Sequence, residues 1–140
     1  MNSLCERHLW QIRNDKEFAW ALWEHLRTMM DEPMLSLPSL QRQFWHGCLE
    51  VIDALKLHAH PALTSCLTIV YSGLQRLGID QQDAHLLCRL HQLLIETCAM
   101  PETTCEDRAT LLGCVMCLEH RWQHDAKDVV FWADTALACH

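Results

Sequence analysis

The chain carries very few residues that break helices, since its 140 residues include only four glycines and four prolines. Phosphate-cradling loops, nucleophile elbows and tight β-hairpins all need residues at positive φ, which glycine mostly supplies. No stretch alternates apolar and polar residues as a half-buried strand does. We therefore predict an all-α fold of about six helices, in which a loop-borne catalytic site has little backbone to occupy.

The length and the charge narrow the classes of function. A chain of 140 residues suits a single domain, which we predict to span residues 1–140. The net charge of −7 repels phosphate backbones, so neither nucleic acid nor an anionic membrane is an expected partner. No apolar run has the length of a membrane span, and the first residues lack the basic and apolar regions of a secretory signal. We expect a cytoplasmic location.

Nine cysteines, an odd number, are expected to remain thiols in a reducing compartment and mostly to pack as small apolar side chains. The six tryptophans can pack in the core, or they can lie on a surface that binds a partner protein. Three of them crowd the N-terminal region, residues 1–30. This region is predicted to be helical and bent near Asn14, with Asp15 capping the part that follows.

Capping and breaking residues delimit the later segments. Residues 31–39 contain two prolines and form the predicted linker. Gly78 is a predicted helix stop, Asp80 and Asp125 are predicted N-caps, and Thr103 to Glu106 has the spacing of a capping box. The helices after the linker are predicted at residues 39–57, 62–77, 80–99, 103–122 and from 125 onward. Their short connections predict antiparallel hairpins in residues 39–140, arranged as a closed bundle or as a tetratricopeptide-like stack.

One run has the residue types of a metal site: Cys114-x-x-Cys117-x-x-His120-x-x-x-His124. On a helix the last three of these fall within roughly 60° of one another, and thiolate and imidazole bind zinc or copper. Structural zinc sites place Cys-x-x-Cys on a turn, however, whereas a straight helix strains it. We therefore predict no metal and no cofactor. A metal-binding or redox-sensing regulator that uses these four residues is the alternative.

The segment from Leu74 through Gly78 and Asp83 to Leu87, together with Leu112-Gly113, resembles the small tetratricopeptide-like chaperones of bacterial type III secretion. That family consists of acidic, cytoplasmic, helical proteins that cradle a secreted needle or translocator subunit in a concave groove. The resemblance implies a role in virulence. It also implies a groove lined by Tyr71, Leu74, Leu87 and Met116.

Taken together, these features favour a non-enzymatic adaptor or chaperone. Acidic charge excludes nucleic acid as the expected ligand, and the scarcity of glycine removes most catalytic loop designs. Stacked hairpins leave a groove between helices that can hold an amphipathic helix of a partner protein. A homo-oligomer is compatible with this function.

Overall fold

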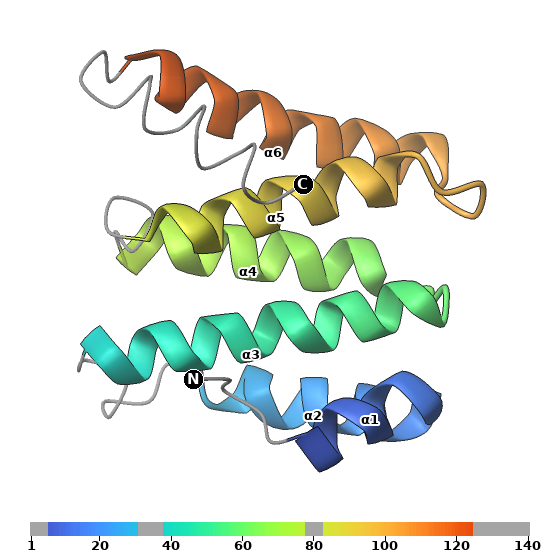
Figure 1. Cartoon of the computed structure of the whole chain (residues 1–140). Coiled ribbons are helices and arrows are strands. Elements are labelled where there is room, and N and C mark those ends of the chain that lie inside the picture. The colour runs from blue at the N-terminus through green and yellow to red at the C-terminus, as the bar shows by residue number, and fades with distance from the viewer. Residues whose placement is uncertain (1–5, 31–37, 78–82, 125–140) are drawn as a thin grey trace. The chain divides into compact units, whose positions relative to one another are not determined.

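The computed structural model describes residues 6–30, 38–77 and 83–124, and within these ranges it contains α-helices and no strands (Figure 1). The prediction of an all-α fold of about six helices is confirmed. The helices are α1 (Glu6–Asn14), α2 (Lys16–Thr28), α3 (Pro38–Leu57), α4 (Leu63–Leu77), α5 (Ala84–Cys98) and α6 (Cys105–His124). Most of the predicted linker, the predicted stop at Gly78 and the predicted helix from residue 125 lie outside the described residues.

The chain divides into two compact units, residues 1–66 and 67–140, and the division falls within α4. In the first unit, α1, α2 and α3 contact one another in all three pairs. In the second unit, α5 packs along α6, as the predicted antiparallel hairpin requires. Organisation as a single domain over 1–140 stays a prediction.

The bend in the N-terminal region is built by Asp15, as predicted. Asp15 has extended backbone angles, and its carboxylate accepts a hydrogen bond from the backbone N–H of Phe18 at 3.1 Å. This N-cap satisfies one of the donors that the first turn of α2 leaves unpaired. Behind the cap, the fully buried Ile12 and Ala19 and the nearly fully buried Trp23 join the core of the first unit.

The turn between α3 and α4 is tied back to the N-terminal helices by two histidines. His58 Nε2 lies 2.9 Å from the backbone carbonyl oxygen of Ile12. Because a carbonyl only accepts, the hydrogen of this ring sits on Nε2. The His60 ring stacks on Trp20 with 4.4 Å between ring centroids, and its Nδ1 accepts from the backbone N–H of Ala62 at 3.0 Å. The predicted break between the helices at residues 39–57 and 62–77 is confirmed.

The hairpin of α5 and α6 corrects two predicted caps. The N-cap of α5 is Asp83, whose carboxylate accepts from Leu86 N–H at 3.0 Å, so the helix begins three residues later than a cap at Asp80 predicts. The hydroxyl of Thr104 accepts from Asp107 N–H at 3.0 Å and caps α6. The hydroxyl of Thr103, the predicted cap, instead donates to the carbonyl of Thr97 and closes the turn.

Trp45 gives a first prediction, because among the described side chains its indole Nε1–H is buried with no hydrogen-bond partner. A buried unpaired donor costs about 1–3 kcal/mol. Trp45→Phe removes this donor, so we expect it to destabilise the chain by at least about 1 kcal/mol less than Trp23→Phe. Trp23 is a matched control, since it is buried to the same degree. Urea denaturation measures the free energy of unfolding of both variants. Equal losses of this free energy in the two variants would contradict the unpaired state of Trp45 Nε1.

His60 gives a second prediction, which concerns the pH dependence of stability. Burial, and then the charges of Lys16 and His58, lower the pKa of His60. The folded chain therefore binds this proton less readily than the unfolded chain. The contribution of neutral His60 to the free energy of unfolding is fully present above the ordinary histidine pKa of about 6.5. This contribution is lost as the pH drops through that value toward the lower pKa of the folded state. In His60→Asn, whose side-chain oxygen can still accept from Ala62 N–H, we expect a smaller loss of melting temperature between pH 7.5 and 5. If His60→Asn loses as much melting temperature over this pH range as the unmodified chain, His60 is not the group that makes stability depend on pH.

Candidate functional site

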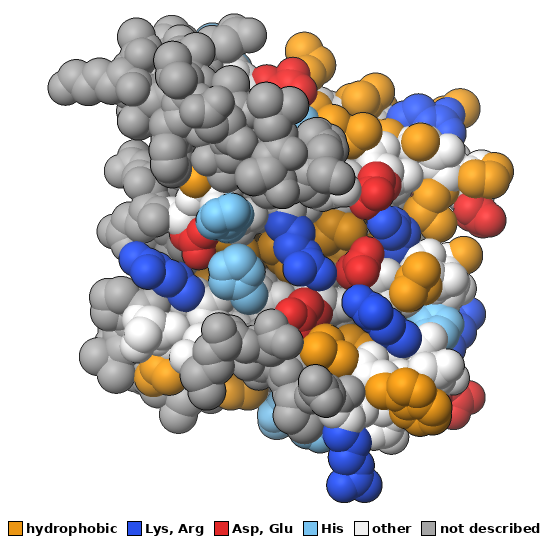
Figure 2. Space-filling view, viewed as in Figure 1, with side chains coloured by type: hydrophobic (Ala, Val, Ile, Leu, Met, Phe, Trp, Pro, Cys, Tyr) orange, Lys and Arg blue, Asp and Glu red, His pale blue; other side chains and the backbone are white. Residues whose placement is uncertain are grey.

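Helix α6 is apolar on two opposite sides. Its inner side buries Leu111, Val115 and Leu118, and α6 packs along α5. The outer side carries a second apolar row at helical spacing, and Figure 2 shows hydrophobic side chains gathered over this helix at the upper right. We call this row the outer face of α6; it consists of Cys105, Ala109, Leu112, Gly113, Met116 and Cys117, all exposed.

The exposure of the outer face is large for apolar side chains. Leu112 is 44% exposed and Met116 is 67% exposed. An ordinary surface helix is apolar on one side only, and a helix that is apolar all round is normally covered on all sides. Neighbouring exposed apolar side chains of this kind are a common feature of surfaces that bind other molecules.

Charged residues bound the outer face at its two ends. Glu106 and Asp107 occupy the first turn of α6, and His120 and Arg121 lie near its other end. Acidic groups at the N-terminus and basic groups at the C-terminus complement the helix dipole. On the outer face itself, the exposed Glu106 lies near the first turn and the exposed His120 lies near the other end, with the apolar side chains between them.

The four residues of the predicted groove fall in different environments. Leu74 and Leu87 are buried, with 1% and 3% exposure, so they support the core and offer almost no surface to a ligand. Tyr71 is half-buried and its hydroxyl accepts a hydrogen bond from Gln75 Nε2 at 2.7 Å. Met116 is the one of the four with a large exposed area. The resemblance implied a groove at Leu74 and Leu87, but an apolar helix face can equally well form part of a core.

Three thiols and a phenol lie near one another in the second unit. Burial, followed by a hydrogen bond with the Cys117 side chain, raises the pKa of Tyr71 to about 12. Burial also raises the pKa of Cys114, and the neighbouring Cys117 and Cys98 raise it further. Burial raises the pKa of Cys98 as well, although Arg108 opposes the change. The raised pKa values of Cys98 and Cys114 favour their protonated thiol form.

The structure brings only part of the alternative metal set together. Cys114 and Cys117 are neighbours on α6, but the described residues hold no group of three or more histidine, cysteine, aspartate or glutamate side chains that could bind a metal ion. The side chain of His124 lies outside the described residues. The alternative function therefore gains no support from the described side chains.

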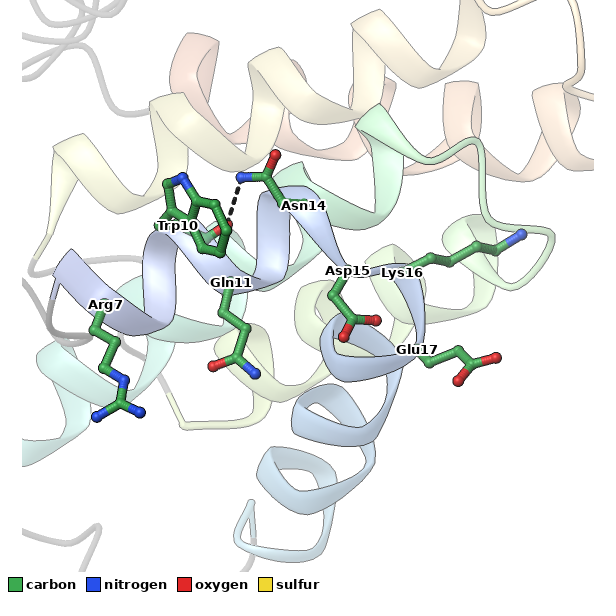
Figure 3. A pocket seen from close by; sticks show the side chains of 7 residues that line it. All are labelled: Arg7, Trp10, Gln11, Asn14, Asp15, Lys16 and Glu17. Atoms are coloured by element: carbon green, nitrogen blue, oxygen red, sulfur yellow. Dashed lines mark hydrogen bonds between the residues drawn. The ribbon is translucent and has the colours of Figure 1, made fainter.

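A shallow hollow of about 760 Å³ lies at the corner of α1 and α2 (Figure 3). Trp10 lies at its edge and is 69% exposed, and Asn14 Nδ2 donates to the backbone carbonyl of Trp10 at 2.8 Å. The other lining residues are polar, and they carry both signs of charge: Arg7, Gln11, Asp15, Lys16 and Glu17. None of these residues pairs a nucleophile with a base, so the hollow does not suit covalent catalysis.

Comparison with known proteins assigns no family to this fold and site. No protein-family model matches the chain, and the curated proteins and the solved structures contain no match to it either. Within residues 6–30, 38–77 and 83–124, no helix has the length and apolar character needed to cross a membrane. A function can therefore be inferred only from the side chains of the chain itself, above all from the outer face of α6.

Cysteine exposure gives a third prediction. The seven cysteines of the described residues form no disulfide. Cys105 and Cys117 are exposed, whereas burial raises the pKa of Cys66 to about 12 and raises that of Cys48 further. Since the thiolate is the reacting form, we expect iodoacetamide to alkylate Cys48 and Cys66 at least about 100-fold more slowly than the exposed pair. Peptide mapping by mass spectrometry measures each rate, and equal rates would contradict the burial.

Proposed function

We propose that this protein is a non-enzymatic adaptor or chaperone that holds an amphipathic helix of a partner protein on the outer face of α6. A cytoplasmic location and a role as a type III secretion chaperone belong to the same proposal. They are supported by the acidic charge and by the sequence resemblance around residues 74–87.

The observation that carries this proposal is the second apolar side of α6. Cys105, Ala109, Leu112 and Met116 follow one another at intervals of four, three and four residues. This spacing is the pattern by which one helix lies along another, with contacts repeating at each turn. The spacing of the exposed face therefore supports binding of an amphipathic helix along α6.

The side chains of this face also suit a chaperone. Met116 is long, flexible and polarisable, so it can adapt to partners of different shape. Ala109 and Gly113 are small, and a Cβ atom added at Gly113 would meet no atom within 4 Å. A partner helix can approach the backbone closely at this point, with Leu112 and Met116 beside it.

Substitution of Met116 gives a fourth prediction. Met116→Glu places a charge in the middle of the outer face, where a bound helix would bury it without a partner. We expect the amount of partner protein that co-purifies with the tagged full chain from its native cell to fall at least about tenfold, a loss typical of a central contact residue. Quantitative mass spectrometry of the purified material measures the change.

The control is Leu57→Glu, at an exposed leucine at the end of α3 that is 61% exposed. Both variants should keep the circular dichroism spectrum and the melting temperature of the unmodified chain. A photo-crosslinker at residue 116 should attach to a partner segment of amphipathic helical sequence, whereas one at residue 57 should not. Equal capture at the two positions, or a partner that survives Met116→Glu, would overturn the proposed function.

A further inference from the structure

We infer that the outer face of α6 also binds a second copy of this chain, as a symmetric dimer with antiparallel α6 helices. The inference concerns the same exposed face as the proposed function, and a partner helix would displace the second copy. The charges of the face are what select this occupant.

Antiparallel pairing is the arrangement in which the face complements itself. The first turn of α6 is acidic, with Glu106 and Asp107, and its other end carries His120 and Arg121. Two parallel copies would place like charges together, which is unfavourable, whereas two antiparallel copies place each acidic end beside a basic end. The two helix dipoles are also opposed in this arrangement.

A two-fold axis at Gly113 brings particular residues opposite one another. Glu106 precedes Gly113 by seven residues and His120 follows it by seven, so each Glu106 faces His120 of the second copy. Seven residues are about two helical turns, which keeps all three positions on one side of α6. The structure agrees, since Glu106, Gly113 and His120 are all exposed. A two-fold axis makes the interface the same patch on both copies.

The residues near the axis allow the helices to approach closely. Gly113 lies on the axis, where an added Cβ would have open space around it. Ala109 faces Cys117 of the second copy, so two small side chains meet on each side of the axis. Leu112 and Met116, which are 44% and 67% exposed in the single chain, flank this contact and supply its apolar area.

The area buried between the two α6 helices indicates how tightly the dimer is expected to form. A single pair of helices of this length buries on the order of 1,000 Å², at the low end of specific interfaces. We therefore expect a dimer that forms reversibly at micromolar or higher concentration and yields to a better-fitting partner helix. Such a dimer covers the exposed apolar face when no partner is present.

Sedimentation equilibrium of the full chain tests the dimer over a range of concentrations. We expect the unmodified protein to shift from monomer to dimer, and Leu112→Glu to raise the dissociation constant at least about tenfold. Leu57→Glu, the same substitution at an exposed leucine outside α6, should leave the constant unchanged. Circular dichroism must show that both variants are folded.

Charge exchange tests the antiparallel arrangement. His120→Glu alone should weaken self-association because it places two carboxylates opposite one another. Glu106→Lys alone should weaken it because it removes the carboxylate that faces His120 of the second copy. Mixed in equal amounts, the two variants should form a heterodimer, since the lysine introduced in one copy then faces the glutamate introduced in the other. An interaction within one chain cannot produce this recovery, because the two positions are fourteen residues apart on one helix.

Three outcomes would overturn the dimer. The first is a monomer at every concentration up to the millimolar range. The second is a Leu112→Glu variant that loses melting temperature relative to Leu57→Glu and stays monomeric, which would show that another segment of the same chain covers the face. The third is a mixture of charge variants that does not associate. The first and third outcomes leave the test with Met116→Glu and a partner untouched, whereas the second would count against both proposals. A chain that stays monomeric and still loses its partner on Met116→Glu would separate failure of the dimer from failure of the proposed function.

Discussion

The packing of α6 along α5 decides which of the two apolar sides of α6 stays exposed. Leu111, Val115 and Leu118 are buried on the inner side. Burial of each such side chain contributes about 1.5–3 kcal/mol, so the hairpin is held mainly by this side. The opposite side, with Leu112 and Met116, receives no equivalent cover among the described residues and becomes the surface on which both proposals depend.

Several polar side chains of the described residues stabilise turns and helix ends. Asp15, Asp83 and Thr104 cap helices, and the two histidines of the α3–α4 turn bind backbone atoms or stack on Trp20. Side chains used in this way are already occupied with structural hydrogen bonds. The outer face of α6 differs from these groups, because its exposed side chains are apolar and can contribute to binding only through burial of their area.

Local rules predicted what depends on neighbouring residues along the chain. Asp15 was identified as a cap because a carboxylate just before an apolar-periodic stretch satisfies the first N–H groups of the helix. The same rule selected Asp80 where the chain uses Asp83, since both residues precede the same apolar run and sequence alone does not rank them. Thr103 was predicted as the cap of the next helix from its capping-box spacing to Glu106, but Thr104 caps α6, and Thr103 serves a contact with Thr97 that only the closed turn creates.

The sequence by itself determined the fold class, because scarce glycine and proline and sustained helical periodicity leave few alternatives to helices. Tertiary structure decided which apolar residues are core and which are surface. Leu87 and Met116 both lie on apolar helix faces in the sequence, yet Leu87 is 3% exposed and Met116 is 67% exposed. Periodicity shows that a face is apolar, but only the position of neighbouring helices determines whether that face is covered.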